Sequence, residues 1–367
     1  MTQYEDRLAQ ERQRFDAEVC VHNLPEIFHY WSNKYLRPFI NGFGYDNIDD
    51  FFVKEIARSK RSDGQPMRIA SVGSGDCATE VRIASGLVAM GVTDFYIVCL
   101  DISDAALERG RGYALDAGLA DRFEMIVHDF NLGLPEGRFD VVMANQSLHH
   151  VVALEELYAA IGQQLVSGGS FLVSDMIGRN GHMRWPEARK LVDEVWGWLP
   201  DRYRYNWQLQ RQEQKFMDWD CSQEGFEGIR AQEVLPLLLE NFSPRVFLAW
   251  GNIIDVFIDR GFGHNFHGRN EWDLHFIDRI HAIDDQAIAD KVIKPTHLLA
   301  KFQNEPGECI CPHGMDPQEA IRVPQVDELL PSPPQTQSPL PLPPALKNLL
   351  RRIPGLVPLY RWFMRIE

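Results

Sequence analysis

The sequence predicts an α/β protein with a doubly wound, seven-stranded sheet. Between residues 68 and 178, short apolar runs alternate with helical patterns at a period of roughly 25 to 30 residues. Such alternation indicates right-handed crossovers between parallel strands, with helices on both faces of the sheet. A glycine pair, Gly73 and Gly75, follows the first strand-like run, as is typical of a sharp turn from a strand into a helix.

The elements follow one another in regular order. Strands are predicted at 69–72, 95–100, 123–127, 141–144, 171–173, 245–250 and 296–302. Helices are predicted at 78–90, 105–117, 154–165 and 231–241. The first two helices end at Gly91 and Gly118, which are typical C-terminal residues. Because ligands of such sheets bind beyond the carboxyl ends of the strands, the loops that follow the strands are where we expect function.

The rest of the chain divides by composition. We predict a helical N-terminal lid at residues 1–60 and the main domain at residues 61–305. A stretch at about 180–245, rich in Trp, Tyr, Arg and Gln, predicts an insertion packed over the ligand face. An irregular segment around 261–267 precedes the last strand. Residues 306–344 predict a linker, in which eight of the 21 residues from 324 to 344 are proline.

The last segment, residues 345–367, combines five Lys or Arg residues with leucine and aromatic residues. A basic, aromatic, amphipathic tail is typical of segments that bind an anionic membrane interface. Docking of this tail on a protein partner, or on the acidic body of the chain, explains the pattern equally well.

Composition excludes several classes of protein. The 367-residue chain has a formal net charge of −15, which argues against nucleic acid as a partner. Its six cysteines are scattered and several lie in apolar runs, so they predict free thiols in a reducing compartment. The charged N-terminal residues lack the apolar core of a signal peptide, and we expect a cytoplasmic protein. The sequence leaves the oligomeric state undetermined.

Three successive strands end in residues suited to a nucleoside ligand. The Gly73–Gly75 turn offers unpaired backbone N–H groups to a ligand that can come close. Asp101 ends the second strand, 26 residues after Gly75, where an acid can accept both hydroxyls of a ribose. Asp129 follows the third strand and is suited to an adenine amino group, with Phe130 or Ile102 stacking on the ring.

These residues resemble the class I S-adenosylmethionine-dependent methyltransferases, whose Rossmann-like fold is the one predicted. The likeness covers about residues 65–178 and includes VGSGDC at 72–77 and HDF at 128–130. It also includes FDVVMANQSLHHV at 139–151 and LVSGGSFLVSD at 165–175. The resemblance implies S-adenosyl-L-methionine as the cofactor. By matching position and by the loops above, the expected cofactor-binding residues are Gly73, Ser74, Gly75, Asp76, Glu80, Asp101, Ile102, Asp129, Phe130, Asn145 and Gln146.

Two positions depart from the family pattern. Ser71 stands where an acidic residue is usual, and Cys77 replaces the third glycine. Glu80 is a candidate for the missing carboxylate. A dehydrogenase is the obvious competitor for a glycine turn followed by an acid. It is disfavoured because the turn lacks the third small residue that a dinucleotide site prefers. A short-chain dehydrogenase would also need a Tyr-x-x-x-Lys spacing after the fourth strand, whereas the only such spacing here, Tyr30 to Lys34, precedes the turn.

Two adjacent histidines, His149 and His150, follow the fourth strand on the ligand side. Transfer of a methyl group to a hydroxyl also requires removal of a proton, for which a histidine base is suited. We predict one of the two as the catalytic base, with a slight preference for His150. No metal is predicted, because His264 and His267 lack a third ligand at a clear spacing.

The acceptor is predicted less directly. Segments at 24–35, 220–228 and 261–265 resemble methyltransferases of surface-polysaccharide and glycan biosynthesis, which implies a sugar hydroxyl as the acceptor. Tyr30 is expected to cover the cofactor, and the expected acceptor-side residues are Trp31, Asp220, Glu224 and His264. The alternatives are a small secondary metabolite as acceptor, and a catalytically silent scaffold of the same fold.

Overall fold

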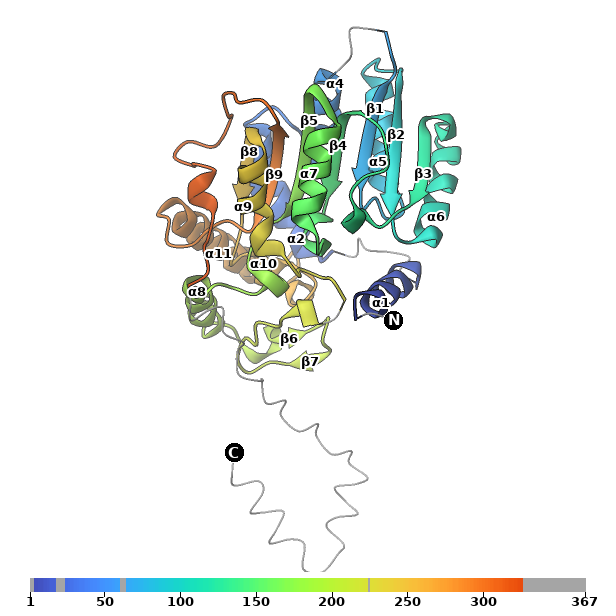
Figure 1. The fold of residues 1–367 in the computed structure, drawn as a ribbon. Helices are drawn as coiled ribbons and strands as arrows, with labels where there is room; N and C mark the ends of the chain where they lie inside the picture. Colours follow the sequence, from blue (N-terminus) through green and yellow to red (C-terminus); the bar gives the residue numbers. More distant parts are fainter. Residues whose placement is uncertain (1–2, 18–23, 60–63, 224, 326–367) are drawn as a thin grey trace, which may run out of the picture. The chain divides into compact units, whose positions relative to one another are not determined.

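The central sheet has seven strands in the order β3-β2-β1-β4-β5-β9-β8 (Figure 1). This computed structural model describes residues 3–17, 24–59, 64–223 and 225–325. Strands β1 to β5 are parallel, and β9 runs antiparallel to both of its neighbours. The strands are β1 (Met67–Val72), β2 (Phe95–Asp101), β3 (Phe123–Val127), β4 (Phe139–Asn145), β5 (Leu165–Met176), β8 (Ser243–Trp250) and β9 (His297–Gln303). All seven predicted strands are present, which confirms the doubly wound sheet.

Helices cover both faces of the sheet because the strand residues alternate between two cores. On one face, α7 (Leu154–Gln164) and α9 (Ala231–Asn241) pack on Val72 and Val142. On the other, α4 (Ile48–Arg58), α5 (Ala78–Ala89) and α6 (Asp104–Asp116) pack on Ile69 and Ile97. The four helices predicted from the sequence are therefore confirmed, and α4 packs on the same face as α5 and α6.

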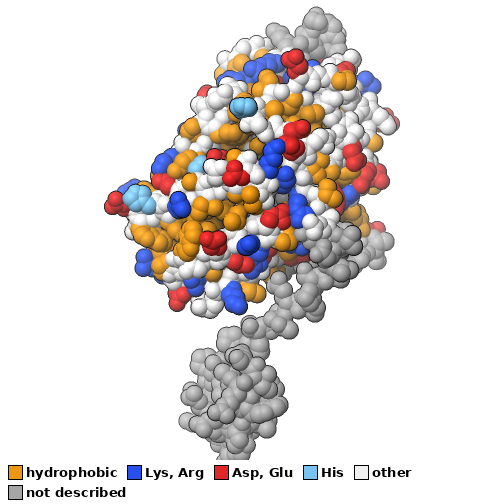
Figure 2. All heavy atoms as spheres, turned by 90° about the vertical axis from the view of Figure 1, so that its left-hand side faces the viewer, with side chains coloured by type: hydrophobic (Ala, Val, Ile, Leu, Met, Phe, Trp, Pro, Cys, Tyr) orange, Lys and Arg blue, Asp and Glu red, His pale blue; other side chains and the backbone are white. Residues whose placement is uncertain are grey.

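A third core packs against Trp250 at the end of β8. It joins α2 (Glu26–Trp31) to α8 (Pro186–Trp196), α10 (Asp255–Ile258) and α11 (Glu271–Ala289). Helix α3 (Arg37–Asn41) continues the N-terminal segment, and β6 (Tyr205–Asn206) pairs with β7 (Arg211–Gln212) in a small hairpin. On the face in Figure 2, acidic and basic side chains of the described residues are interspersed among hydrophobic ones.

The 19-residue helix α11 was not predicted from the sequence. Its start is nevertheless encoded, because the Asn270 side chain accepts hydrogen bonds from the N–H groups of Trp272 and Asp273. Phe276, Ile277 and Ile280 then place a buried stripe at helical spacing.

The N-terminal segment is not one lid, contrary to the prediction for residues 1–60. Helix α4 packs on α5 as part of the sheet domain, and α2 packs in the third core. Helix α1 (Gln3–Ala17) behaves differently, because Tyr4 and Asp16 bond to loops after β3 and β2. Among the described N-terminal helices, α1 is therefore the one whose side chains bond to loops at the ligand end of the strands.

The predicted linker begins too early. Ile310 donates its N–H to the Arg245 carbonyl and accepts from the Phe247 N–H, so this segment extends the β8 edge. Arg322 forms an ion pair with Glu187 of α8. The remainder of the linker and the whole basic tail, residues 326–367, lie outside the described residues. Within the described ranges, no helix is long and apolar enough to cross a membrane.

Candidate active site

The glycine turn after β1 is held against two other strands. The N–H groups of Gly73 and Ser74 donate to the Leu100 carbonyl of β2, at 2.8 and 3.1 Å. Gly73 and Gly75 have φ values of +69° and +54°, which favour glycine. A Cβ on Gly73 would lie 2.5 Å from Cβ of Ser147, in the loop after β4. This close approach explains the first glycine of the motif.

Asp101 connects the turn to the end of β2. Its side chain is 8% exposed and accepts hydrogen bonds from the N–H groups of Gly75 (2.8 Å) and Ser103 (2.9 Å). Burial raises the pKa of Asp101, while these two N–H groups and the interaction with His150 oppose the rise. The carboxylate predicted for a ribose is thus fixed beside the turn, and His150 is near enough to influence it.

Glu80 is a buried carboxyl group without full hydrogen bonding. Its Oε1 accepts from the Ser71 hydroxyl at 2.7 Å, whereas Oε2 has no hydrogen-bond partner. Burial raises the pKa of Glu80 to about 7. The carboxyl group therefore lies next to Ser71, where the family pattern has an acid, and one of its oxygens is available to a ligand.

The second departure from the family pattern, Cys77, is compensated by a neighbouring helix. Cys77 has a φ of +57° and precedes α5, and the Asp76 side chain accepts from the Ala78 N–H at 3.1 Å. A Cβ on Gly110 of α6 would lie 3.0 Å from the Cys77 side chain. Gly110 therefore makes room for the Cys77 side chain, which a glycine in the turn would not need.

The predicted adenine segment is arranged in part as expected. Ile102 and Phe130 are both 8% exposed, and Phe130 lies close to Gly73. Asp129, however, has protein partners on both oxygens. Oδ2 accepts from the Tyr4 hydroxyl at 2.6 Å, and Oδ1 accepts from the N–H and the amide of Asn131.

The loop after β4 is fixed by buried hydrogen bonds. Ser147 donates its hydroxyl to the Val72 carbonyl, and the N–H groups of Ser147 and Leu148 both donate to Asp175 Oδ2. Gln146 has a φ of +55°, and Asn145 ends the strand beside it. The predicted residues Asn145 and Gln146 therefore adjoin the glycine turn through Ser147.

His149 lies between two carboxylates. Its Nδ1 is 2.6 Å from Asp175 Oδ1, and its Nε2 is 3.4 Å from Glu227 Oε1. The side chain is 4% exposed. Burial alone lowers the pKa of His149, but the charges and hydrogen bonds of Asp175 and Glu227 raise it to about 10. At neutral pH His149 is therefore a protonated partner of two acids.

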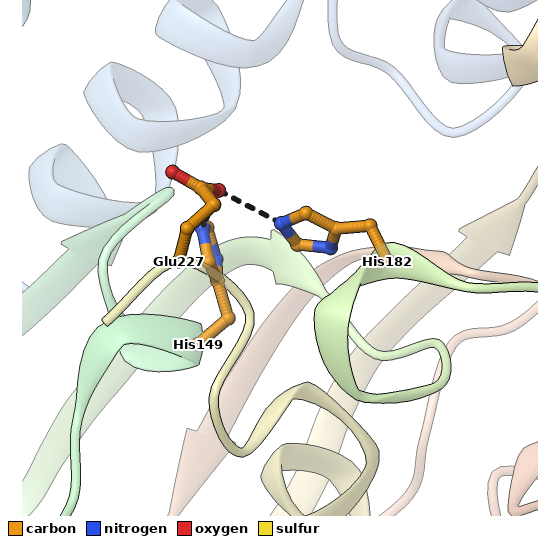
Figure 3. Close-up of side chains that lie close together, drawn as sticks. All are labelled: His149, His182 and Glu227. Carbon is orange, nitrogen blue, oxygen red and sulfur yellow. Dashed lines mark hydrogen bonds and ion pairs between the residues drawn. The ribbon is translucent and has the colours of Figure 1, made fainter. Parts of the chain in front are cut away.

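Glu227 lies close to three histidines, of which Figure 3 shows His149 and His182. Its Oε1 accepts from His182 Nε2 at 2.8 Å, and its Oε2 is 3.8 Å from His150 Nε2. Burial alone would raise the pKa of Glu227, but hydrogen bonds from His149 and His182 hold it well below its usual range. Glu11 of α1 approaches the same cluster, 3.3 Å from His150 Nδ1.

The aromatic residues predicted to cover the site lie elsewhere. Tyr30 donates its hydroxyl to Asp278 of α11, and Trp31 donates its indole N–H to His281 of the same helix. Trp31 also lines a separate cavity of about 500 Å³ with Trp250. An aromatic stripe at helical spacing fits a packing face as well as a lid, and here it packs.

The predicted acceptor residues are not brought together either. Asp220 accepts hydrogen bonds from Ser222 and Gln223, so it stabilises its own turn. His264 contacts Trp207, and Glu224 lies outside the described residues. The cluster instead recruits His182 and Asp175, which were not predicted as site residues. Asp175 could have been predicted from the sequence, because an acid at the carboxyl end of a parallel strand faces the ligand end of the sheet.

Comparison with known proteins adds a family assignment to this geometry. Residues 65–218 match the model of a family described as a methyltransferase domain. This segment resembles a methyltransferase domain. It contains the glycine turn, Asp101, and the histidines after β4, whereas Glu227 lies beyond it.

Relatives and solved structures resemble this chain at low identity. The sterol 24-C-methyltransferase of Eremothecium gossypii is 28% identical over 131 residues, 34% of this chain and 35% of the relative. That of Saccharomyces cerevisiae is 24% identical over 201 residues, 52% and 50% of the two chains. The chain thus spans between about a third and a half of the length of these curated relatives. An O-methyltransferase from a Brevibacillus brevis trans-AT PKS multienzyme, solved with S-adenosyl-L-homocysteine, has 12% identity and a TM-score of 0.42, covering 77% of this chain and 81% of that one.

Proposed function

We propose that this chain transfers a methyl group from S-adenosylmethionine to a small-molecule acceptor. The proposal depends mainly on one observation, the buried Asp101 carboxylate bonded to the Gly75 N–H within the methyltransferase domain. This arrangement supports a ribose-binding role for Asp101, because the acid lies next to a turn that a ligand can approach closely.

The residues around the turn fit the cofactor chemically. Asp101 would hold the ribose hydroxyls, and Ile102 and Phe130 offer apolar surface for the adenine. Glu80 would hold the cationic amino group of the methionine end, because its Oε2 is buried without a hydrogen-bond partner. A cation at this position would favour the ionised carboxylate, whose burial alone is unfavourable.

When bound, S-adenosylmethionine supplies a methyl group on a sulfonium leaving group for in-line displacement. The chain's own residues then orient the acceptor, exclude water and accept a proton where the acceptor has one. His149 is protonated between Asp175 and Glu227, so it is unsuited to begin as the base. We therefore assign the proton-accepting role to His150, whose side chain is 16% exposed at the edge of the cluster.

The relatives, and not the site, support the proposed class of acceptor. The curated relatives described above are sterol 24-C-methyltransferases by name, which favours a small molecule over a glycan precursor. The sugar hydroxyl predicted from the sequence has no support among them. Asp220, which was expected to grip sugar hydroxyls, is engaged in its own turn.

A silent scaffold is disfavoured by the histidine cluster. Burying histidines and carboxylates together costs stability unless each is paired, and a packed apolar site of similar volume would do as well for folding. We therefore expect turnover to be lost when His149 and His150 are both replaced by alanine, with cofactor binding retained. Retained methyl transfer to an identified acceptor by this double variant would contradict the assignment of the base.

Calorimetric titration with S-adenosylmethionine tests the cofactor assignment. Asp101→Ala should weaken binding by about 10-fold to 100-fold, since hydrogen bonds to a charged group contribute roughly 1.5–3 kcal/mol. Asp104→Ala is the matched control, because this acid lies three residues further on and its side chain is 78% exposed. Equal affinity of the Asp101 and Asp104 variants would refute the ribose role of Asp101.

A further inference from the structure

We propose that His149, His182 and Glu227 bind a divalent transition-metal ion. One ligand atom from each residue lies within 4.8 Å of the other two. The three side chains come from the loop after β4, the loop after β5 and the loop before α9, and they point toward one another (Figure 3). Three separate segments therefore converge on one point.

Two of the three pairs of donor atoms have a spacing close to that of ligands of one ion. Ligands at about 2.0–2.2 Å from one ion, at tetrahedral or octahedral angles, lie roughly 3–3.5 Å apart. His149 Nε2 is 3.4 Å from Glu227 Oε1, and His182 Nε2 is 2.8 Å from the same oxygen. Two imidazoles and one carboxylate form a ligand set suited to Zn²⁺, Co²⁺ and Fe²⁺, and they leave at least one coordination position open.

The carboxylate behind His149 is also typical of a metal site. A metal-bound histidine typically donates its other ring N–H to a carboxylate, which fixes the ring and its tautomer. Asp175 is completely buried, is held by the N–H groups of Ser147 and Leu148, and lies 2.6 Å from His149 Nδ1. This contact leaves Nε2 of His149 facing Glu227, as a ligand would.

The charges around the cluster favour a cation. Asp175, Glu227 and Glu11 bring three carboxyl groups to the histidines, and Asp175 and Glu11 are at most 3% exposed. Buried ionised carboxylates require compensating charge, which a divalent ion supplies more fully than one protonated imidazole. The ion would take the place of the proton shared between His149 and Glu227.

The role of the ion follows from its position and rests on the proposed function. His150 lies 3.8 Å from Glu227 and its charge also influences Asp101, so the ion would lie beside the proposed cofactor site. An acceptor oxygen bound in the open position would be held for methyl transfer, and its deprotonated form would be stabilised. The acceptor class thereby narrows to small molecules that present an oxygen ligand.

Cobalt titration of the full chain, after treatment with a chelator, tests the metal site without cofactor or acceptor. We expect one Co²⁺ per chain, with visible absorption bands of nitrogen and oxygen ligation. His182→Ala and Glu227→Gln should each weaken Co²⁺ binding at least 100-fold, while His264→Ala, which removes a histidine outside the cluster, should leave it unchanged.

Three results would overturn the proposal. They are the absence of Co²⁺ binding to the unmodified chain, thiolate-to-cobalt absorption bands that assign the ion to cysteines, and unchanged affinity in both ligand variants. Circular dichroism of each variant establishes that it folds. Asp101→Ala, tested in parallel, should lose cofactor affinity and keep Co²⁺ affinity, so failure of the metal site and failure of the cofactor site are distinguishable.

Discussion

At the residue scale, Glu80 couples folding to pH. Its pKa rises from 4.5 in the unfolded reference to about 7, because burial disfavours the charged form. Its contribution to stability is therefore complete below pH 4.5 and is lost as the pH rises through 7. Relative to the unmodified chain, Glu80→Gln should gain roughly 3 kcal/mol of unfolding free energy between pH 4.5 and pH 8.

Urea denaturation at these two pH values measures the difference. Glu108→Gln provides the control, because this residue lies on the exposed side of α6 with a side chain 73% exposed. A Glu80→Gln difference that is the same at both pH values would show that the carboxyl group titrates normally in the folded chain.

Single residues were predictable from the sequence where strand order fixes their position. Asp101 ends β2 and Gly73 follows β1, so any parallel sheet with this order brings them together. Tyr30 and Trp31 were misassigned because aromatic residues at helical spacing are equally suited to a core. His182 lies on an irregular loop, whose path depends on tertiary packing that no local pattern encodes.

At the scale of elements, the contact between the β1 turn and the loop after β4 should determine the effect of Gly73→Ala. The new Cβ would meet Ser147 at 2.5 Å with φ at +69°, so we expect a loss of roughly 2–5 kcal/mol of unfolding free energy. Gly91→Ala shares the positive φ, at +78°, but has no atom within 4 Å of its Cβ, so its cost should be only about 1–2 kcal/mol.

Urea denaturation gives the unfolding free energy of Gly73→Ala, of Gly91→Ala, and of the double variant Gly73→Ala/Ser147→Gly. The second substitution removes the atom that the new Cβ meets, and should restore part of the loss. Equal destabilisation by Gly73→Ala and Gly91→Ala would show that backbone conformation alone sets the requirement for glycine.

Regular elements were predicted well and their connections poorly. Every strand of the main sheet has an apolar run of its own, and the sheet agrees with all seven predictions. Helix α11 was overlooked, although Asn270 and the stripe of Phe276, Ile277 and Ile280 mark it. The prediction of a lid at residues 1–60 included too many helices. A helix with one apolar face can pack on a core or cover a ligand, and its own sequence pattern does not distinguish the two.

At the scale of the whole molecule, the basic tail yields a separate prediction. Truncation after residue 325 should abolish sedimentation with anionic liposomes, because each of the five Lys or Arg residues at 345–367 contributes about 1 kcal/mol near such a surface. Neutral liposomes, and a full-length variant with Arg351 and Arg352 changed to Glu, are the controls. Sedimentation that is indifferent to the truncation would exclude the tail as a membrane anchor.

We propose that one end of the sheet holds both the cofactor and the histidine cluster. A crystal structure of the full chain with S-adenosyl-L-homocysteine tests it most directly. We expect the ribose hydroxyls within hydrogen-bonding distance of Asp101, the amino group beside Glu80, and the sulfur facing His149 and His150. The ligand bound elsewhere, or no bound ligand at saturating concentration, would contradict the account.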